Sequence, residues 1–285
     1  MTRLFFALLK LWTISISFAL ASPGNCEENI SEKVQKSLKL AGFSCEEKNL
    51  GNCTYTECTG TLPNYPRPVL FSIPSEATEF RLHFHGHKLG VYPEYEKSLT
   101  SMIKSFSLNS EICQSKQITA FPDSLGKCTT YDEVLKDKAG LEVFFNDLNV
   151  VSGQHLKTLP FHISAHSGGG RTVTRILNAQ FPVAQVTIFD GIYSDTQKRS
   201  LIDWYQKAEG KLVLASVKGM SPETYSTQFK KDLGLMIKSS KIKIKGTDFD
   251  VHESDRFIHY SRAAGPEGST KAHYDVLTQT WPESR

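Results

Sequence analysis

Short apolar runs alternate with amphipathic segments along most of the chain. The runs are typical of buried strands, because they are short and rich in β-branched and aromatic residues. They occupy residues 68–74, 80–86, 117–122, 159–165, 183–189 and 211–217. Segments with apolar residues every three or four positions predict helices at 30–40, 95–106, 130–151, 169–180, 195–210 and 221–240. The alternation predicts an α/β fold of three layers, with a mostly parallel sheet and helices on both faces.

Two of the predicted helices begin at recognisable capping residues. Thr130 or Asp132 is expected to cap the helix at 130–151, and Ser221 is expected to cap the helix at 221–240. Residues 241–249 begin with alternating lysine and isoleucine, which is typical of a strand with one face in water.

The first residues have the features of a secretory signal peptide. Arg3 precedes an apolar run that ends in a small-x-small pattern at residues 19–21. An uncleaved membrane anchor is the alternative, but it needs about 20 apolar residues and this run is shorter. We therefore expect a signal peptide at 1–21, a disulfide-rich extension at 22–65 and the main domain at 66–285. The mature protein is then secreted or periplasmic, without an integral membrane segment.

All six cysteines lie beyond the expected cleavage point. An even number of cysteines in an exported chain indicates disulfide bonds. Proximity along the sequence favours the pairs Cys26–Cys45, Cys53–Cys58 and Cys113–Cys128. A zinc site is the alternative, but the chain has no paired Cys-x-x-Cys motif, so no metal is expected there.

The composition is that of a globular protein, with 39% hydrophobic and 22% charged residues. The formal net charge of +3 is small for 285 residues. It gives no reason to expect a nucleic-acid partner.

The segment ISAHSGGGR at 163–171 places a serine between an apolar run and a helical pattern. A serine nucleophile on a sharp strand-to-helix turn needs small residues two positions before and after it. Ala165 and Gly169 meet that need around Ser167. Glycine-rich turns of this kind also bind phosphate, but the consecutive glycines do not follow the G-x-G-x-x-G spacing of dinucleotide sites. Ser167 is therefore the candidate nucleophile.

With this motif the chain resembles the α/β-hydrolase superfamily from about residue 68 to residue 281, although Ala165 replaces the first glycine of G-x-S-x-G. The second motif is the His-Gly pair in LHFHGHKLG, residues 82–90. The resemblance implies an oxyanion hole formed by backbone N–H groups of His87 or Gly86 and of Gly168. A metal site made by His83, His85 and His87 is the alternative, but no acidic cluster accompanies these histidines.

The superfamily order of serine, acid and histidine implies a base late in the chain. His273, after a glycine-rich loop, occupies that position, with His259 and His252 as alternatives. We call the sharp turn around Ser167, residues 165–169, the elbow. Asp190 directly follows the next apolar run, at 183–189, and is the candidate acid. Asp195 lies close by. Many members place the acid one strand later, where this chain offers only Glu223. If the last strand supplies the acid, the candidates are Asp248, Asp250 and Asp255.

The sequence therefore predicts an exported serine hydrolase that cleaves an ester, or an amide, by acyl transfer through Ser167, His273 and Asp190. Its partner is a small-molecule or polymeric acyl substrate, and no cofactor is expected. Tyr92, Tyr95 and Tyr193 are candidates to line the substrate cleft. The alternatives are a peptidase-like or cell-wall amidase-like hydrolase, a metal-dependent hydrolase built on the strand histidines, and a non-catalytic secreted binding protein on a hydrolase scaffold.

Overall fold

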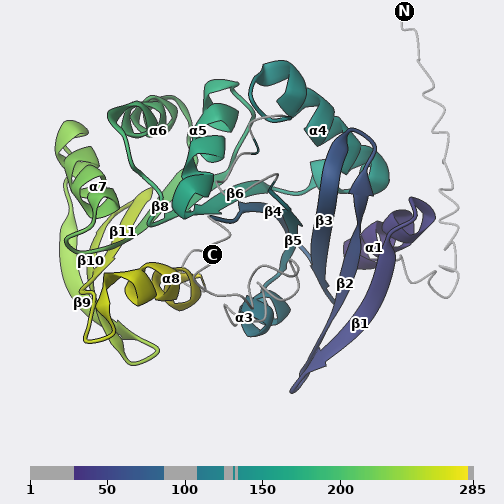
Figure 1. The fold of residues 1–285 in the computed structure, drawn as a ribbon, viewed down its shortest axis with the longest axis horizontal. Coiled ribbons are helices and arrows are strands. Elements are labelled where there is room, and N and C mark those ends of the chain that lie inside the picture. Colours follow the sequence, from purple (N-terminus) through teal and green to yellow (C-terminus); the bar gives the residue numbers. More distant parts are fainter. Residues whose placement is uncertain (1–28, 87–107, 125–130, 132–133, 282–285) are drawn as a thin grey trace, which may run out of the picture.

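The computed structural model describes residues 29–86, 108–124, 131 and 134–281 (Figure 1). The expected signal peptide and the predicted helix at 95–106 lie outside these residues.

Eleven strands of the described residues form one twisted sheet (Figure 1). They are β1 Ser44–Leu50, β2 Cys53–Leu62, β3 Tyr65–Pro74, β4 Glu79–Phe84, β5 Gln117–Pro122, β6 Phe161–His166, β7 Gln185–Phe189, β8 Lys211–Val217, β9 Lys238–Ile244, β10 Thr247–Ser254 and β11 Phe257–Arg262. Their order across the sheet is β1-β2-β3-β5-β4-β6-β7-β8-β11-β10-β9. Each of the six apolar runs of the sequence overlaps one strand of this sheet.

The sheet is mixed, so the expectation of a mostly parallel sheet is wrong. Its centre, β5-β4-β6-β7-β8-β11, is parallel. The flanks are antiparallel: β1, β2 and β3 join the sheet through β3 and β5, and β9, β10 and β11 form a meander at the other end. Short connections of a few residues link the strands of each flank, and such connections can join only antiparallel neighbours.

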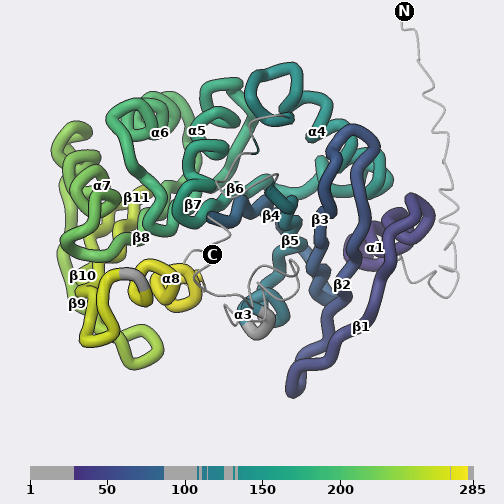
Figure 2. The backbone as a smooth tube through the Cα atoms, in the orientation of Figure 1, coloured from purple at the N-terminus to yellow at the C-terminus, as the bar shows by residue number. Residues whose placement is uncertain are grey.

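Helices cover both faces of the sheet, as the alternating pattern predicts. They are α1 Ile30–Leu40, α3 Leu108–Gln114, α4 Lys138–Val151, α5 Gly170–Asn178, α6 Asp195–Lys207, α7 Ser221–Asp232 and α8 Gly268–Thr280. Apolar side chains of α1, α4, α5, α6 and α7 enter one buried cluster, and those of α3 and α8 enter a second one. Figure 2 shows α8 and α3 on the side of the sheet opposite to α5 and α6. The central strands are therefore buried between two cores.

The predicted bounds of two helices and one strand differ clearly from the structure. Helix α4 begins at Lys138, where the Asp137 side chain accepts a hydrogen bond from the Gly140 N–H at 2.9 Å, so neither predicted residue caps it. Ser221 is the first residue of α7 instead of its cap, and the helix ends at Asp232. Beyond that point Gly234 adopts a φ of 59°, and the predicted helical residues from 238 onward form β9. The predicted strand at 241–249 is the end of β9, a turn, and the start of β10.

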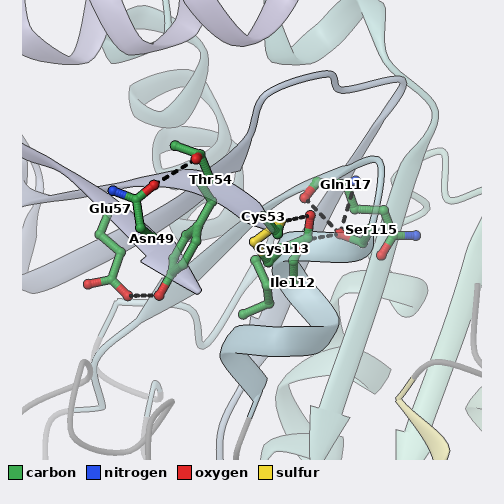
Figure 3. Close-up of a disulfide and its surroundings, with 9 residues drawn as sticks. Asn49, Cys53, Thr54, Glu57, Ile112, Cys113, Ser115 and Gln117 are labelled. Carbon is green, nitrogen blue, oxygen red and sulfur yellow. Dashed lines mark hydrogen bonds between the residues drawn. A yellow bond between two sulfur atoms is a disulfide. The ribbon is translucent and has the colours of Figure 1, made fainter. Parts of the chain in front are cut away.

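Two disulfides staple the N-terminal strands, and both differ from the predicted pairs. Cys45 on β1 bonds Cys58 directly opposite on β2. Cys53 on β2 bonds Cys113 at the end of α3 (Figure 3). Next to it, the Ser115 hydroxyl bonds the carbonyl of Ile112 and so fastens the chain between α3 and β5. The predictions from proximity along the sequence are wrong because the register of β1 and β2 brings Cys45 to Cys58, and the packing of α3 brings Cys113 to Cys53. Cys26 and Cys128 lie outside the described residues.

No helix within the described ranges is long and apolar enough to cross a membrane.

Candidate active site

Ser167 lies on a sharp turn at the end of β6, in the middle of the parallel part of the sheet. The strand ends at His166, a single 3₁₀ turn follows at Ser167–Gly169, and α5 begins at Gly170. Ser167 has a φ of 53°, in the left-handed region that a non-glycine residue rarely adopts. Such backbone strain is concentrated at functional sites, where the surrounding structure maintains it.

Close backbone contacts maintain this turn and explain its glycines. A Cβ atom on Gly169 would lie 2.3 Å from the carbonyl oxygen of Phe84 at the end of β4. A Cβ on Gly170 would lie 2.2 Å from the carbonyl oxygen of Gly191, in the loop after β7. A Cβ on Gly86 would lie 2.5 Å from Cβ of Ser167 itself. The turn therefore packs against the loops that follow both neighbouring strands.

Asp190 directly follows β7 and holds His273. Its Oδ2 atom lies 2.5 Å from Nδ1 of His273, and its Oδ1 accepts a hydrogen bond from the Val217 N–H at 3.2 Å. Asp190 is fully buried, and its backbone has a φ of 44°. A carboxylate oxygen accepts, so Nδ1 of the imidazole carries the proton and donates it. In neutral His273, Nε2 is then the unprotonated nitrogen, as a general base requires.

His273 lies on α8, in the second turn of the helix. The sequence placed it between a glycine-rich loop and a short helical run, and the structure puts it inside the helix. Strand β11 feeds this helix, and β11 is parallel to β8. The chain segments that carry Ser167, Asp190 and His273 thus all follow the carboxyl ends of parallel strands, the edge where ligands bind in such sheets.

The Ser167 hydroxyl does not bond His273 in this structure. Among the described residues, its hydrogen-bond partner is the Tyr193 hydroxyl, at 3.4 Å. The Tyr193 hydroxyl in turn donates to the backbone carbonyl of Asp190 at 2.9 Å. Burial of its hydroxyl end raises the pKa of Tyr193 to about 12, so the phenol is neutral. Of the three tyrosines expected near the cleft, Tyr193 is at the site, and Tyr92 and Tyr95 lie outside the described residues.

His166 precedes the serine and joins β6 to α8. Its Nε2 atom lies 2.9 Å from the carbonyl oxygen of His273, and the two rings are 4.5 Å apart. Burial, followed by the nearby His273, holds the pKa of His166 well below its usual range. The ring is therefore neutral, and its Nε2–H is the donor to the carbonyl.

Two of the three candidate oxyanion donors, Gly168 and Gly86, lie among the residues that the structure describes. Gly168 follows Ser167 in the 3₁₀ turn, and Gly86 lies just beyond β4, against Ser167. The carbonyl of Gly86 accepts a hydrogen bond from Nδ1 of His85 at 2.8 Å. His87 lies outside the described residues.

The two alternative bases and most of the alternative acids contact other residues. His259 bonds Ser216 at 2.8 Å within the sheet, and His252 bonds Ser239 at 3.0 Å. Ion pairs occupy three of the alternative carboxylates: Asp195 with Lys198, Asp248 with Lys243, and Asp250 with Lys218. Glu223 bonds Thr227, and Asp255 is exposed in the turn between β10 and β11.

The strand histidines have protein partners. His83 bonds the Ser164 hydroxyl at 2.9 Å and packs against Phe121 and Trp281. Nε2 of His85 accepts a hydrogen bond from the Ser124 N–H, with the two nitrogens 3.3 Å apart. The described residues contain no group of three or more histidine, cysteine, aspartate or glutamate side chains that could hold a metal ion.

Sequence reasoning missed the residues that support the site. His166 and Gly191 lie beside recognised residues, but only the folded structure shows that they contact His273 and the elbow. Gln197 fastens the loop after β7 by accepting from the Tyr193 N–H at 2.8 Å and donating to the Gly191 carbonyl at 3.4 Å. The Val217 N–H has no signature in the sequence, because every non-proline residue carries such a donor.

The sequence matches no protein-family model and no curated protein. Among solved structures, the chain is similar to TT1662 from Thermus thermophilus, with 14% identity, a TM-score of 0.48 and coverage of 80% of this chain and 99% of that one. It is also similar to dienelactone hydrolase from Anabaena variabilis, with 14% identity, a TM-score of 0.44 and coverage of 82% and 97%. A cold-adapted esterase from an Arctic intertidal metagenomic library shares 9% identity at a TM-score of 0.43, with coverage of 82% and 96%.

The molecule's own topology defines its fold. In α/β-hydrolases a serine elbow leads from a parallel strand into a helix, and the acid and the histidine follow the serine in chain order. Here β6 lies within the parallel part of the sheet, and the candidate residues Ser167, Asp190 and His273 follow one another along the chain. The chain has an α/β-hydrolase-like fold.

Proposed function

We propose that this protein is a serine hydrolase that cleaves a carboxylic ester by acyl transfer, with Ser167 as nucleophile, His273 as base and Asp190 as orienting acid. The observation that carries the proposal is the 2.5 Å contact between Asp190 and Nδ1 of His273 at the edge of the sheet where the strained Ser167 lies. A buried carboxylate that fixes the imidazole tautomer is the arrangement that makes histidine a base for serine.

The first half of the reaction forms an acyl-enzyme. Ser167 Oγ turns from Tyr193 toward Nε2 of His273, which takes the hydroxyl proton while Oγ bonds to the carbonyl carbon of the ester. Asp190 stabilises the imidazolium without itself becoming protonated. When the tetrahedral intermediate collapses, the bond to the alcohol oxygen breaks, and the imidazolium gives its proton to the departing alcohol.

The second half releases the acid. Water enters in place of the alcohol, gives a proton to His273 Nε2 and bonds to the acyl carbon. The bond to Ser167 Oγ then breaks, and the serine recovers its proton from the imidazolium. The products are the carboxylic acid and the alcohol, and the protein returns to its starting state.

Backbone N–H groups supply the electrostatic stabilisation. We assign the developing oxyanion to the N–H of Gly168 and to an N–H of the Gly86–His87 segment. Such donors are fixed before the reaction, so they need no reorganisation when the negative charge appears; removing one costs on the order of 10²–10³ in kcat in serine hydrolases. Gly86 suits this place, since a side chain there would overlap Ser167.

We also propose that the protein is exported to an oxidising compartment. The Cys45–Cys58 and Cys53–Cys113 disulfides support this, because such bonds persist outside the reducing cytosol. The apolar segment near the N-terminus is then a cleaved signal peptide. N-terminal sequencing of protein recovered from the oxidising compartment tests this, with cleavage expected after residue 21.

The catalytic proposal is tested with a fluorophosphonate probe and matched ester and amide substrates. We expect labelling of the folded protein at Ser167, hydrolysis of esters in preference to the matched amides, and loss of both activities in Ser167→Ala. Ser221→Ala is the control, since Ser221 is an exposed serine at the start of α7. Folded wild-type protein that is not labelled at Ser167 would contradict the nucleophile, and faster amide cleavage would contradict the substrate class.

A further inference from the structure

Tyr193 occupies an unusual place between the candidate nucleophile and the candidate acid. Its hydroxyl lies 3.4 Å from Ser167 Oγ and 2.9 Å from the backbone carbonyl of Asp190. The tyrosine is 40% exposed, so its ring borders the open side of the site. No step of the proposed reaction uses this hydroxyl.

The number of hydrogen-bond donors at this contact determines which hydroxyl donates and which accepts. A neutral phenol has one proton to donate, and the Asp190 carbonyl can only accept. The Tyr193 proton therefore goes to that carbonyl, at the shorter distance. In the contact with Ser167 the tyrosine oxygen is then the acceptor, and the serine hydroxyl is the donor. The proton that the reaction must transfer to His273 points at Tyr193 instead.

The tyrosine is held in this place by the loop after β7. Its backbone N–H donates to Gln197 Oε1 at 2.8 Å, and the preceding residues of the loop pack on the elbow through Gly191. Ser194 caps α6 directly after it, accepting from the Gln197 N–H at 3.2 Å. The chain is thus fastened on both sides of the tyrosine, at Gly191 and at Ser194, and the bond of the Tyr193 hydroxyl to the Asp190 carbonyl keeps the side chain beside Ser167.

We propose that Tyr193 is a positioning residue that holds the Ser167 hydroxyl in a resting orientation, turned away from His273, until substrate enters the site. This inference rests on the proposed function and adds a regulation of the same nucleophile. Rotation of Ser167 about its side-chain bond exchanges the Tyr193 oxygen for His273 Nε2 as acceptor. A bound acyl group promotes that exchange by occupying the space beside the exposed tyrosine.

The effect on reactivity has a definite sign. A hydrogen bond that exists only in the resting state must be broken before the reaction, so it lowers the reactivity of the free protein. A neutral hydrogen bond contributes about 0.5–1.5 kcal/mol, which corresponds to roughly a 2- to 10-fold effect. Loss of a purely structural contact would have the opposite sign, because the site would loosen.

Tyr193→Phe tests the proposal, since it removes the hydroxyl and keeps the ring. We expect the second-order rate of fluorophosphonate labelling and kcat/KM for a matched ester to rise by roughly 2- to 10-fold. The gain should appear mainly as a lower KM, with kcat nearly unchanged, because bound substrate has already turned the serine. Tyr225→Phe is the control, at a tyrosine of α7 that packs against the core, and it should leave the labelling rate and the kinetic constants unchanged.

A crystal structure of Tyr193→Phe gives a second measurement that does not need activity. We expect Ser167 Oγ within hydrogen-bond distance of His273 Nε2. Labelling of the variant that is equal to or slower than that of the wild type overturns the proposal, as does a serine still turned toward position 193. Absence of labelling in the wild type would instead contradict the nucleophile, and the orientation of Ser167 would still decide the role of Tyr193.

Discussion

The ring of His166 donates a hydrogen bond from Nε2 to the backbone carbonyl oxygen of His273 at 2.9 Å. This bond joins the last residue of β6 to α8, so it fixes the helix that carries the candidate base relative to the strand that leads to the candidate nucleophile. The two segments lie far apart in the sequence but form one unit at the site.

Replacing His166 by phenylalanine should remove the hydrogen bond that holds α8 to the end of β6. The ring volume is nearly kept, but the donor is lost, so we expect the free energy of unfolding to fall by about 1 kcal/mol. We also expect kcat to fall roughly tenfold, since about 1.4 kcal/mol of lost transition-state stabilisation corresponds to that factor. His166→Gln, which retains an N–H donor, should recover part of both. Equal losses in the two variants would show that the hydrogen bond is not what matters.

Asp190→Asn should abolish most of the activity without unfolding the protein. Asparagine tolerates the left-handed backbone at this position, so the fold is kept. The amide cannot stabilise the imidazolium of His273, and kcat should fall on the order of 10³- to 10⁴-fold. Steady-state kinetics with a matched ester measure this. Asp195→Asn, at an exposed aspartate on α6, provides the comparison and should retain full activity.

Gly86→Ala should displace the serine. The added Cβ would lie 2.5 Å from Cβ of Ser167, so one of the two segments must move. We expect kcat/KM to fall at least about tenfold, with a loss of stability of about 1–3 kcal/mol from overpacking. Gly219→Ala separates strain from displacement, because its Cβ would point into open space at a φ of 83°. That variant should lose about 1–2 kcal/mol of stability from its left-handed backbone and keep its activity.

Stability should fall as the pH drops below about 6.5. Burial holds the pKa values of His83, His166 and His259 well below the usual range, and burial with the nearby Arg81 lowers that of His162 to about 4. The unfolded chain therefore takes up protons near pH 6.5 while the folded protein does not. Each such histidine lowers the free energy of unfolding by about 1.4 kcal/mol per pH unit until it titrates in the fold.

Urea denaturation at pH 7, 6 and 5 measures this dependence. His162→Gln should flatten the curve between pH 6.5 and 4 by the contribution of one proton. A stability that is constant over that range would show that these histidines take up protons as readily in the folded protein as in the unfolded chain.

The two disulfides should contribute unequally to stability. Cys53 and Cys113 are 60 residues apart, whereas Cys45 and Cys58 are separated by 13. Restriction of the unfolded chain predicts a loss of about 4 kcal/mol for a double serine variant of the first pair and about 3 kcal/mol for the second. Urea denaturation of the two double variants compares them. A larger loss for the Cys45–Cys58 variant would mean that native contacts of the β1–β2 pair, and not chain entropy, dominate.

The central strands were predictable because burial on both faces makes their sequences continuously apolar. The direction of the outer strands was not, since the pattern of apolar residues is the same in parallel and antiparallel pairs. Helix ends were missed where one backbone conformation decides them, as at Gly234, or where a later residue is the cap, as at Asp137. The disulfides depend on contacts between Cys53 and Cys113 that no local pattern contains.

In the candidate site, too, the residues of a local motif were predictable and the contacts that depend on the fold were not. Ser167 and the small residues around it form a local motif, and the sequence also singled out Asp190 and His273, which the structure brings together. Their supporting contacts are nonlocal: the Val217 N–H on Asp190 and the His166 ring on His273 come from other strands. The hydroxyl of Tyr193 was named only as a cleft residue, because its contact with Ser167 depends on the fold of the loop after β7.

Because Asp190 follows β7, the loop after β8 does not carry the candidate acid. Strand β8 lies between the strands that lead to Asp190 and to His273, yet it contacts Asp190 through backbone groups: the Val217 N–H donates to the carboxylate, and the Ala215 carbonyl accepts from the Asp190 N–H at 2.6 Å. A backbone donor survives almost any change of side chain. The side chains at residues 218 and 220, directly after β8, can therefore be changed without removing either backbone group that holds Asp190, whereas Gly219, with a φ of 83°, should be kept.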